Sequence, residues 1–124
     1  MDPQLKRGFL EACVLASLQS GESYGYRIIK SVPAPLELTE STLYPLLKRL
    51  EAEGSIVANA VEHNGRLRKY YRLTSVGEER IERFLAGRTH VEEIYGYIES
   101  RRHTEARVDG TTHAAAQTEE GNHE

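Results

Sequence analysis

Hydroxyl, phenol and cationic side chains gather on one face of residues 39–54. They are Ser41, Thr42, Tyr44, Lys48 and Arg49. Such side chains donate hydrogen bonds to base edges and phosphate oxygens, so the set suits contact with nucleic acid. The apolar residues between them recur at helical spacing, at Leu43, Leu46, Leu47 and Leu50, and predict one amphipathic helix. Most helices with a polar face bind nothing, so the neighbouring segments must decide between the two interpretations.

A second set of cations lies in residues 63–74, which hold four arginine or lysine residues and no acid. This segment contains Asn64-Gly65, the strongest short-range signal for a β-hairpin, and places Arg66, Arg68 and Lys69 at or near its tip. A basic tip suits phosphate contact. A solvated edge strand protected by cations has the same pattern. Because the hairpin follows the polar helix directly, the pair favours nucleic-acid binding.

Patterns of catalytic or metal-binding residues do not stand out. We find no Ser/His/Asp set, carboxylate pair or phosphate-binding loop, and therefore do not expect an enzyme. Cys13 lies in an apolar stripe without a neighbouring cation to lower its pKa, which indicates packing rather than a reactive thiol. His103, His113 and His123 are ten residues apart, which is not a ligand spacing. We expect neither a cofactor nor a metal.

The net charge of −3 over 124 residues conceals an uneven distribution. Residues 103–124 hold five acids and one base, whereas the other 102 residues carry 15 bases and 14 acids. Local charge therefore matters more than net charge for binding. With 39% apolar residues, no run long enough to span a membrane and no signal-peptide pattern, we expect a globular cytoplasmic protein without a membrane partner.

Two further helices are expected before the polar helix. Residues 4–18 carry a broad apolar stripe, and a short helix over residues 24–31 follows with Ser23 as its N-cap. Two prolines in residues 32–35 must end that helix. Alternating apolar residues at positions 36–38 predict a very short strand.

The polar helix has clear ends, with Thr39 as its N-cap and Gly54 after its last turn. Pro45 lacks the N–H for a helical hydrogen bond and is expected to bend the first turns. Two strands should follow, over residues 56–61 and 69–73, joined by the hairpin turn.

A final helix is expected from Thr74 or Ser75 to about Arg102. It is too long to bury its apolar stripe against so small a domain, so a second copy of the same helix is the expected partner. Residues 103–124 have the composition of a disordered polar tail.

This order of elements predicts a mainly α, α+β fold, a winged helix-turn-helix. It has a three-helix core with a two-stranded β wing, plus a long C-terminal helix. The expected divisions are a DNA-binding domain over residues 1–74, a dimerisation helix over 75–102 and a tail over 103–124. The third helix would enter the major groove, and the wing would reach the flanking backbone or minor groove.

Over residues 5–100 the sequence resembles the PadR family of bacterial transcriptional regulators. The matching residues are Tyr24-Gly25-Tyr26, Thr42-Leu43-Tyr44-Pro45-Leu46-Leu47-Lys48-Arg49-Leu50-Glu51 with Gly54, Gly65-Arg66, and Arg68-Lys69-Tyr70-Tyr71-Arg72-Leu73-Thr74 with Gly77. The middle and wing motifs together are specific to this family. The single C-terminal helix resembles the shorter branch of the family.

The resemblance implies DNA contacts from three segments: Tyr24 and Tyr26; Ser41, Thr42, Tyr44, Lys48 and Arg49; and Arg66, Arg68 and Lys69. Some of these side chains have a structural alternative. Arg49 can pair with Glu53 along its own helix. Tyr26 can belong to the core, and at least one of Tyr70 and Tyr71 should do so.

The resemblance also implies a homodimer that represses promoters at a palindromic operator, on the nucleoid, and is released by a small phenolic or drug-like effector. The expected dimerisation residues are Phe9, Ile81, Phe84, Val91, Tyr95 and Ile98. The chain has no Trp, unlike the drug-binding members. Arg88 with Tyr95 is the candidate effector site, and pairing of Arg88 with Glu92 is the alternative that we favour. A winged-helix module that binds protein instead of DNA remains the second functional class.

Overall fold

The computed structural model of the chain describes residues 1–110, and the side chains of residues 1–102. Its contacts divide it into a winged-helix unit, Met1–Leu85, and a second unit from Ala86 onward, and each is described by itself. The order of elements is α1 (Pro3–Ala16), α2 (Gly25–Ser31), a 3-10 helix (Ala34–Leu36), α3 (Glu40–Ala52), β1 (Ile56–His63), β2 (Arg66–Leu73), α4 (Ser75–Ala86) and α5 (Arg88–Gly110).

The first helix, α1, begins where local chemistry favours it. The Asp2 side chain accepts a hydrogen bond from the Gln4 backbone N–H at 3.0 Å, and Pro3 occupies the first turn, where its missing N–H costs nothing. Val14 and Leu15 near the end of α1 are buried. This end of the helix therefore anchors α1 to the core.

Ser23 does not cap α2, contrary to the sequence prediction. Its backbone forms an isolated bridge with Tyr71 of the wing, through Ser23 N to Tyr71 O at 3.0 Å and Tyr71 N to Ser23 O at 2.8 Å. Tyr24 occupies the N-cap position with an extended backbone. The start of α2 is thus tied to the strand that carries the wing cations.

The expected short strand at residues 36–38 is also wrong. Ala34–Leu36 forms a single 3-10 turn, after which Glu37 adopts a left-handed backbone with φ of 50°. Leu36 and Leu38 both enter the core. Their alternation in the sequence reflects a turn that buries the residues on either side of Glu37, not a strand.

The limits of α3 agree with the sequence prediction. Thr39 occupies the N-cap position, although its hydroxyl contacts the hydroxyls of Ser41 and Thr42, at 3.2 and 3.4 Å, instead of a backbone N–H. Gly54 follows the helix with φ of 80°, a conformation that favours glycine. Pro45 lies inside α3.

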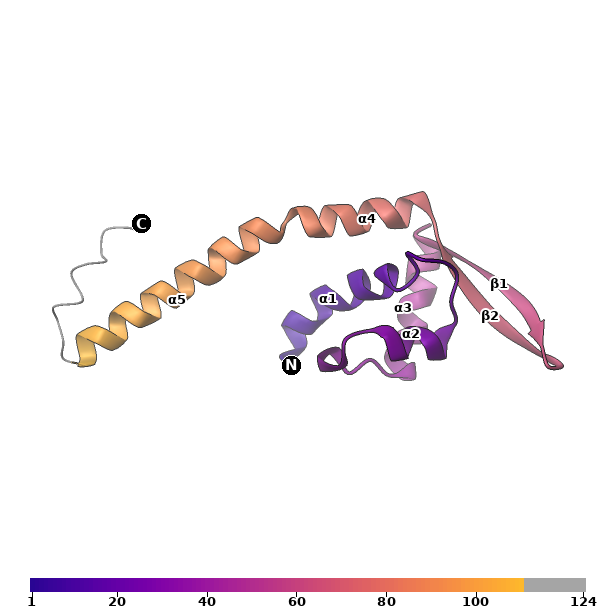
Figure 1. Cartoon of the computed structure of the whole chain (residues 1–124), viewed down its shortest axis with the longest axis horizontal. Helices are drawn as coiled ribbons and strands as arrows, with labels where there is room; N and C mark the ends of the chain where they lie inside the picture. Colours follow the sequence, from indigo (N-terminus) through magenta and orange to yellow (C-terminus); the bar gives the residue numbers. More distant parts are fainter. Residues whose placement is uncertain (111–124) are drawn as a thin grey trace. The chain divides into compact units, whose positions relative to one another are not determined.

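The wing is an antiparallel hairpin in which Ile56 pairs with Leu73 and His63 pairs with Arg66. Asn64 and Gly65 have φ angles of 51° and 77°, the two positive values of a type I′ turn. The Asn-Gly prediction is therefore confirmed, and both strands are longer than expected. Figure 1 shows the hairpin extending away from the helices of its unit.

The core of the winged-helix unit lies between α1, α2 and α3 and the base of the wing. Its buried apolar residues are Val14, Leu15, Leu18, Ile28, Val32, Leu36, Leu38, Leu43, Leu46, Leu47, Leu50, Ile56 and Tyr71. All four leucines that predicted α3 are buried, and their position turns the polar face of that helix to solvent. Tyr71, rather than Tyr70, is the buried tyrosine of the wing, with 4% exposure.

Thr74 joins the wing to α4. Its hydroxyl accepts from the Gly77 backbone N–H at 3.2 Å and lies 2.7 Å from the Gly54 carbonyl oxygen, to which it donates. Gly77 is required here, because a Cβ at this position would collide with the Ser55 carbonyl oxygen and lie 2.6 Å from Leu73 Cδ1. Of the two caps that the sequence offered, Thr74 and Ser75, it is Thr74 that caps the helix.

The single C-terminal helix predicted from the sequence is instead two helices, with Gly87 between them. Glycine lowers helix propensity, which accounts for the break at this position. α5 also continues to Gly110, so residues 103–110 are helical where a disordered tail was expected. The remainder of that tail, residues 111–124, lies outside the described residues. None of the helices in the described part of the chain is long and apolar enough to cross a membrane.

Candidate nucleic-acid interface

The exposed face of α3 carries Ser41, Tyr44 and Lys48. Tyr44 is 45% exposed although its neighbours Leu43 and Leu46 are buried. Among the described residues, Lys48 forms no ion pair. This face therefore presents a hydroxyl, a phenol and a free cation to solvent.

Thr42 and Arg49 lie on the flank of α3 that faces α1. Arg49 Nη2 lies 3.4 Å from Glu11 Oε1 on α1, and Arg49 Nε lies 3.8 Å from Glu53 Oε2. The pairing with Glu53 that the sequence offered as an alternative is thus present. Arg49 already has two carboxylate partners and is less available to phosphate than Lys48.

Tyr24, at the start of α2, organises the cations beside α3. Its ring packs edge-on against Tyr70 of β2, with 5.5 Å between the ring centroids. The guanidinium of Arg68 lies 4.1 Å from the Tyr24 ring centroid and that of Arg27 lies 4.9 Å from it. These cation–π contacts hold two positive charges on one side of the unit. Arg68 is consequently positioned by the protein before any ligand arrives.

A hollow between α2, α3 and the wing brings five of the predicted DNA-contacting residues together. It is lined by Tyr24, Gly25, Tyr26, Tyr44, Leu67, Arg68 and Lys69. Tyr26 is 60% exposed, so its side chain is not part of the core. Gly25 permits the close approach of α3, because a Cβ there would lie 2.8 Å from Tyr44 Cζ and closer still to its hydroxyl.

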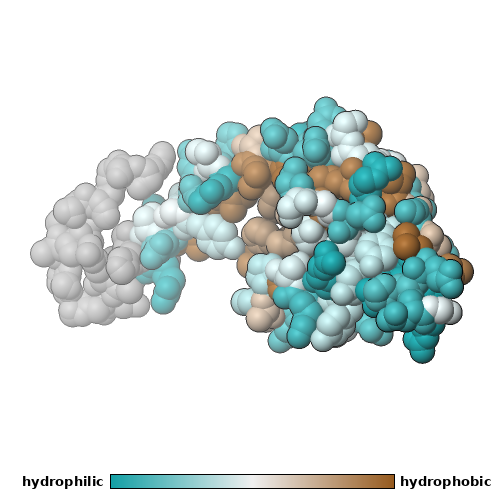
Figure 2. Space-filling model, turned by 45° about the vertical axis from the view of Figure 1, so that its right-hand side comes forward, coloured by the Kyte–Doolittle hydropathy of each residue, from teal (hydrophilic) through white to brown (hydrophobic). Residues whose placement is uncertain are grey.

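The tip of the wing is exposed and carries three cations together with one apolar side chain. Arg66 and Lys69 are exposed, Arg68 is half-buried against Tyr24, and Leu67 is 75% exposed. Figure 2 shows a face that is mostly hydrophilic, with a band of hydrophobic residues across its upper half and a few more at the right edge. The arrangement suits a polyanion that lies across α3 and reaches the wing.

A protein-family model for the transcriptional regulator PadR-like family matches residues 14–83, more than half of the chain. The chain belongs to the PadR-like family of transcriptional regulators. The matched segment includes most of the winged-helix unit, with α2, α3 and both strands of the wing. Membership of this family agrees with the sequence prediction of a regulator and not an enzyme.

Solved structures of other regulators are similar to this PadR-like chain. A transcriptional regulator from Clostridium thermocellum is 26% identical, with a TM-score of 0.68, over 76% of this chain and 96% of that chain. A PadR family regulator from Eggerthella lenta is 31% identical, with a TM-score of 0.67, over 77% of this chain and 85% of that chain. Bacillus subtilis PadR, solved in complex with operator DNA, is 29% identical, with a TM-score of 0.57, over 62% of this chain and 46% of that chain.

The expected dimerisation residues of this PadR-like regulator fall into two groups. In the winged-helix unit, Phe9 and Phe84 pack edge-on with 5.5 Å between ring centroids, and half-buried Ile81 packs against the core of its own unit. In α5, the other three residues are between 47% and 55% exposed, at Val91, Tyr95 and Ile98.

Both candidate effector residues of the regulator, Arg88 and Tyr95, lie on α5. Arg88 Nε lies 3.1 Å from Glu92 Oε2, one helical turn along α5. This is the exposed pair that the sequence offered as the alternative to effector binding. Tyr95 is 52% exposed on the same helix.

Several side chains at or near these surfaces were not among the residues singled out from the sequence. Arg27 follows Tyr24 at i+3, a helical spacing that could have indicated their contact. Leu67 stands between Arg66 and Arg68 in the wing. An apolar residue at that position of a strand fits either an exposed tip or a packed face, so the sequence alone did not single it out. Ile94 and Tyr97 extend the exposed apolar surface of α5, with 60% and 55% exposure. The spacing of Ile94 from Val91, Tyr95 and Ile98 could have placed it on their face of the helix, whereas Tyr97 lies outside that spacing.

Two ionisable side chains in or beside the core, Cys13 and Tyr71, have raised pKa values. Burial raises the pKa of the Cys13 thiol, which keeps it protonated and agrees with the predicted packing role. Burial also raises the pKa of Tyr71, assisted by the charges of Tyr44 and Glu51. Within the described residues, no group of His, Cys, Asp or Glu side chains could hold a metal ion.

Proposed function

We propose that this PadR-like regulator binds a palindromic operator as a homodimer and represses transcription there. The observation that carries the proposal is the hollow shared by α2, α3 and the wing, where Tyr44, Arg68 and Lys69 meet on one surface. The complex of Bacillus subtilis PadR with operator DNA supports the same use of the fold. The operator lies on double-stranded DNA, so the regulator would act on the nucleoid in the cytoplasm.

Each proposed contact has a distinct role. Ser41 and Tyr44 at the N-terminal half of α3 would reach base edges in the major groove, whereas Thr42, on the flank that faces α1, would contact DNA only at the edge of that face. Lys48 would contact phosphate, and Arg49 would do so only if it left its carboxylate partners. Tyr24 and Tyr26 at the start of α2 would contact the backbone of the DNA.

The wing cations would contribute affinity and register more than sequence readout. Arg66 and Lys69 are exposed and reach outward, whereas Arg68 is held against the Tyr24 ring. Each phosphate neutralised by such a cation steepens the dependence of affinity on salt by about 0.9 in log–log slope for duplex DNA.

The dimer would form through the apolar surface of α5, together with Phe9 and Phe84. Val91, Ile94, Tyr95 and Ile98 recur at i, i+3, i+4 and i+7, which places them on one face of α5. An isolated helix gains nothing from exposing such a face. A second copy of the same helix would cover it and pair two α3 helices for a two-fold symmetric site.

Arg88 and Tyr95 are the candidate residues for control by a small effector. The guanidinium of Arg88 is paired with the Glu92 carboxylate, and an anionic effector would have to displace that carboxylate to bind. We therefore favour a structural role for Arg88, where α5 would cross the same helix of the second copy. Titration of phenolic ligands should leave operator affinity unchanged in the wild type and in Arg88→Ala alike.

The test is the affinity of the full chain for the DNA upstream of its own gene, measured by fluorescence anisotropy from low to high salt. Lys48→Ala with Arg68→Ala should weaken binding at least a hundredfold, because each copy loses two contacts and a hydrogen bond to a charged group contributes about 1.5–3 kcal/mol. The log–log salt slope should fall by about 3.6, since the homodimer loses two phosphate contacts in each copy. Circular dichroism should show that the variant remains folded.

The matched control is Arg83→Ala with Arg102→Ala, which removes the same charge from exposed positions outside the proposed interface. It should keep nearly the wild-type affinity and salt slope. Equal losses in both double variants would mean that net charge alone drives binding. Full affinity in Lys48→Ala with Arg68→Ala would contradict the proposal and leave the protein-binding module as the better description.

A further inference from the structure

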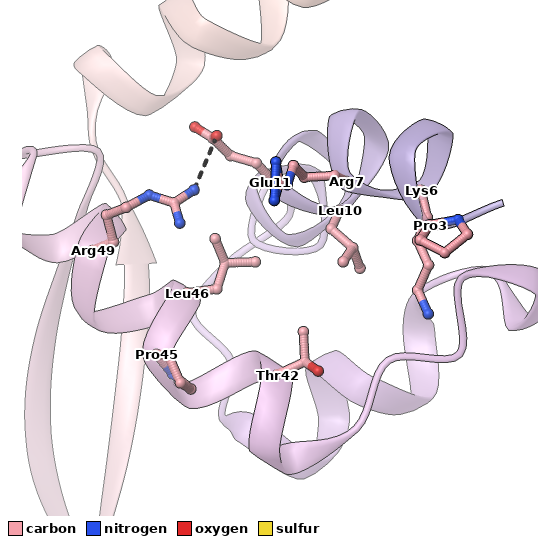
Figure 3. Close-up of a pocket in the computed structure, with 9 residues that line it drawn as sticks. All are labelled: Pro3, Lys6, Arg7, Leu10, Glu11, Thr42, Pro45, Leu46 and Arg49. Atoms are coloured by element: carbon pink, nitrogen blue, oxygen red, sulfur yellow. Dashed lines mark hydrogen bonds and ion pairs between the residues drawn. The ribbon is translucent and has the colours of Figure 1, made fainter. Parts of the chain in front are cut away.

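A second hollow in the winged-helix unit lies between α1 and α3, on the flank of α3 that carries Thr42 and Arg49. It is a pocket of about 340 Å³ whose lining residues are drawn in Figure 3. The side chains of Leu10, Thr42 and Leu46 point toward the space between the two helices (Figure 3). None of the DNA-contacting roles proposed above requires a pocket here.

The floor of the pocket is aliphatic. Leu10 of α1 and Leu46 of α3 face it, and Pro3 and Pro45 complete it. The lining contains no aromatic ring, so the pocket offers no stacking surface. An aliphatic floor at an otherwise polar surface favours a ligand with a hydrocarbon body.

The rim of the pocket is positively charged. Lys6, Arg7 and Arg49 line it, with Glu11 as the only acid of the lining. In Figure 3 Lys6 and Arg49 stand on opposite sides of Leu10, so the cations surround the floor. A negative group would meet a positive charge at either end of the pocket.

Of the three cations at the rim, Arg49 is paired with Glu11 and Glu53, Lys6 is weakly paired, and Arg7 is left as the available charge. Glu11 is bound by Arg80, which does not line the pocket, as well as by Arg49 at 3.4 Å. Lys6 lies 3.9 Å from Glu37, a carboxylate with 71% exposure, and such a pair is weak. Arg7 has no ion-pair partner among the described residues.

We propose that this pocket binds a small aliphatic carboxylate. Its hydrocarbon body would lie on Leu10 and Leu46, and its carboxylate would accept hydrogen bonds from the Arg7 guanidinium, with Lys6 or Arg49 nearby. Planar guanidinium groups match carboxylates in geometry, which makes arginine a fitting partner. The volume falls at the lower end of the range for small-molecule sites, about 300–1,000 Å³, and suits a ligand of this size.

A phosphate of the operator is the other anion that could approach this rim. It would gain nothing from the aliphatic floor, because the sugar–phosphate backbone is polar. The floor of leucine and proline therefore favours the carboxylate over the phosphate, and the experiment below separates them.

Occupation of the pocket would weaken operator binding, a consequence that rests on the function proposed above. Thr42 and Arg49 belong to α3, so the bound anion would place a negative charge beside the helix that approaches the DNA. Like charges repel at this range, and the anion would also compete for Arg49. The pocket would thus act as a regulatory site within the winged-helix unit.

The test of binding uses the full chain without DNA, titrated with hexanoate and followed by NMR chemical shifts. Hexanamide, which lacks the charge, and acetate, which lacks the body, are the matched probes. Hexanoate should bind saturably, with shifts at Leu10 and Leu46, and about tenfold more tightly than either probe. Arg7→Gln should lower hexanoate affinity about tenfold, whereas Arg83→Gln, on exposed α4, should leave it unchanged.

Equal binding of hexanoate and hexanamide, or equal hexanoate affinity in Arg7→Gln and Arg83→Gln, would overturn the proposed site. A lower DNA salt slope in Arg7→Gln without any hexanoate binding would show a phosphate contact and would also overturn it. Saturating hexanoate should weaken operator affinity in the wild type and not in Arg7→Gln. Hexanoate binding with unchanged operator affinity would overturn the regulatory role of the pocket. Hexanoate binding by a chain that has no affinity for DNA would contradict the proposed DNA-binding function and leave the pocket proposal standing.

Discussion

At the scale of single residues, Gly25 controls where Tyr44 of α3 lies. Gly25→Ala would add a Cβ 2.8 Å from Tyr44 Cζ and push the exposed phenol aside. Because Tyr44 is a proposed base contact, operator affinity should fall about tenfold while the fold is retained. Anisotropy on the promoter fragment measures the affinity.

Gly8→Ala is the matched control, since nothing lies within 4 Å of a Cβ at that position in α1. It should raise the free energy of unfolding by about 1 kcal/mol through helix propensity and leave operator affinity unchanged. In a Tyr44→Ala background, Gly25→Ala should have no further effect on affinity. An equal additional loss there would contradict the proposed clash.

A second residue-scale prediction concerns Cys13, whose thiol pKa is raised by burial. Thiolate is the reactive form, so a raised pKa leaves less thiolate at any pH below it. Alkylation of the folded protein by iodoacetamide should reach half its maximal rate at a higher pH than alkylation of free cysteine. A half-maximal rate at a lower pH would identify an activated thiol and contradict the packing role.

At the scale of elements, one cluster of charged side chains links α1, α3 and α4. Arg80 of α4 contacts Glu11 of α1 and donates to Glu53 Oε1 at 2.6 Å and to Ser55 Oγ at 2.8 Å. Hydrogen bonding to Glu53, followed by the charges of both carboxylates, raises the Arg80 pKa. Arg80 therefore stays charged at any pH at which the protein is folded.

Loss of the Glu11 carboxylate should loosen this cluster. Glu11→Gln is expected to lower the free energy of unfolding by about 1 kcal/mol, a modest value because the groups are partly solvated. Urea denaturation measures the change. Glu79→Gln, on the exposed side of α4, should be neutral. Equal free energies of unfolding in Glu11→Gln and Glu79→Gln would contradict a stabilising role for this cluster.

The elements that the sequence predicted correctly are those with local signals. The Asn64-Gly65 turn requires only its own two residues, and the leucine spacing of α3 identifies both its core face and its polar face. The bridge of Ser23 to Tyr71 was missed because its partners are far apart in the sequence. The break at Gly87 was missed because isolated glycines are also tolerated within helices.

The same division applies to the candidate site. The exposed side chains of α3 and the wing cations follow from periodicity and turn chemistry. The contact of Arg49 with Glu11 and that of Arg68 with Tyr24 depend on how α1, α2 and the wing pack together. Sequence spacing alone therefore identified the cations, but not which of them are held by contacts within the protein.

At the scale of the whole molecule, the exposed apolar face of α5 should hold two copies together. Val91→Glu with Ile98→Glu would place two acids on that face and should convert a dimer into a monomer. Sedimentation velocity measures the change. Thr89→Glu with Ser100→Glu adds the same charge away from Val91 and Ile98, and it should remain dimeric. A wild-type chain that sediments as a monomer at all concentrations would contradict the dimer.

The central claim is that two α3 helices read the major groove of one operator while the wings contact the flanking backbone. Hydroxyl-radical footprinting with guanine N7 methylation interference, on the promoter of the regulator's own gene, tests it most directly. We predict interference at two groups of guanines about one helical turn apart, or a multiple of it, each flanked by protected sugars. Tyr44→Ala should remove the guanine interference and keep the backbone protection. Backbone protection without any guanine interference in the wild type would contradict the claim.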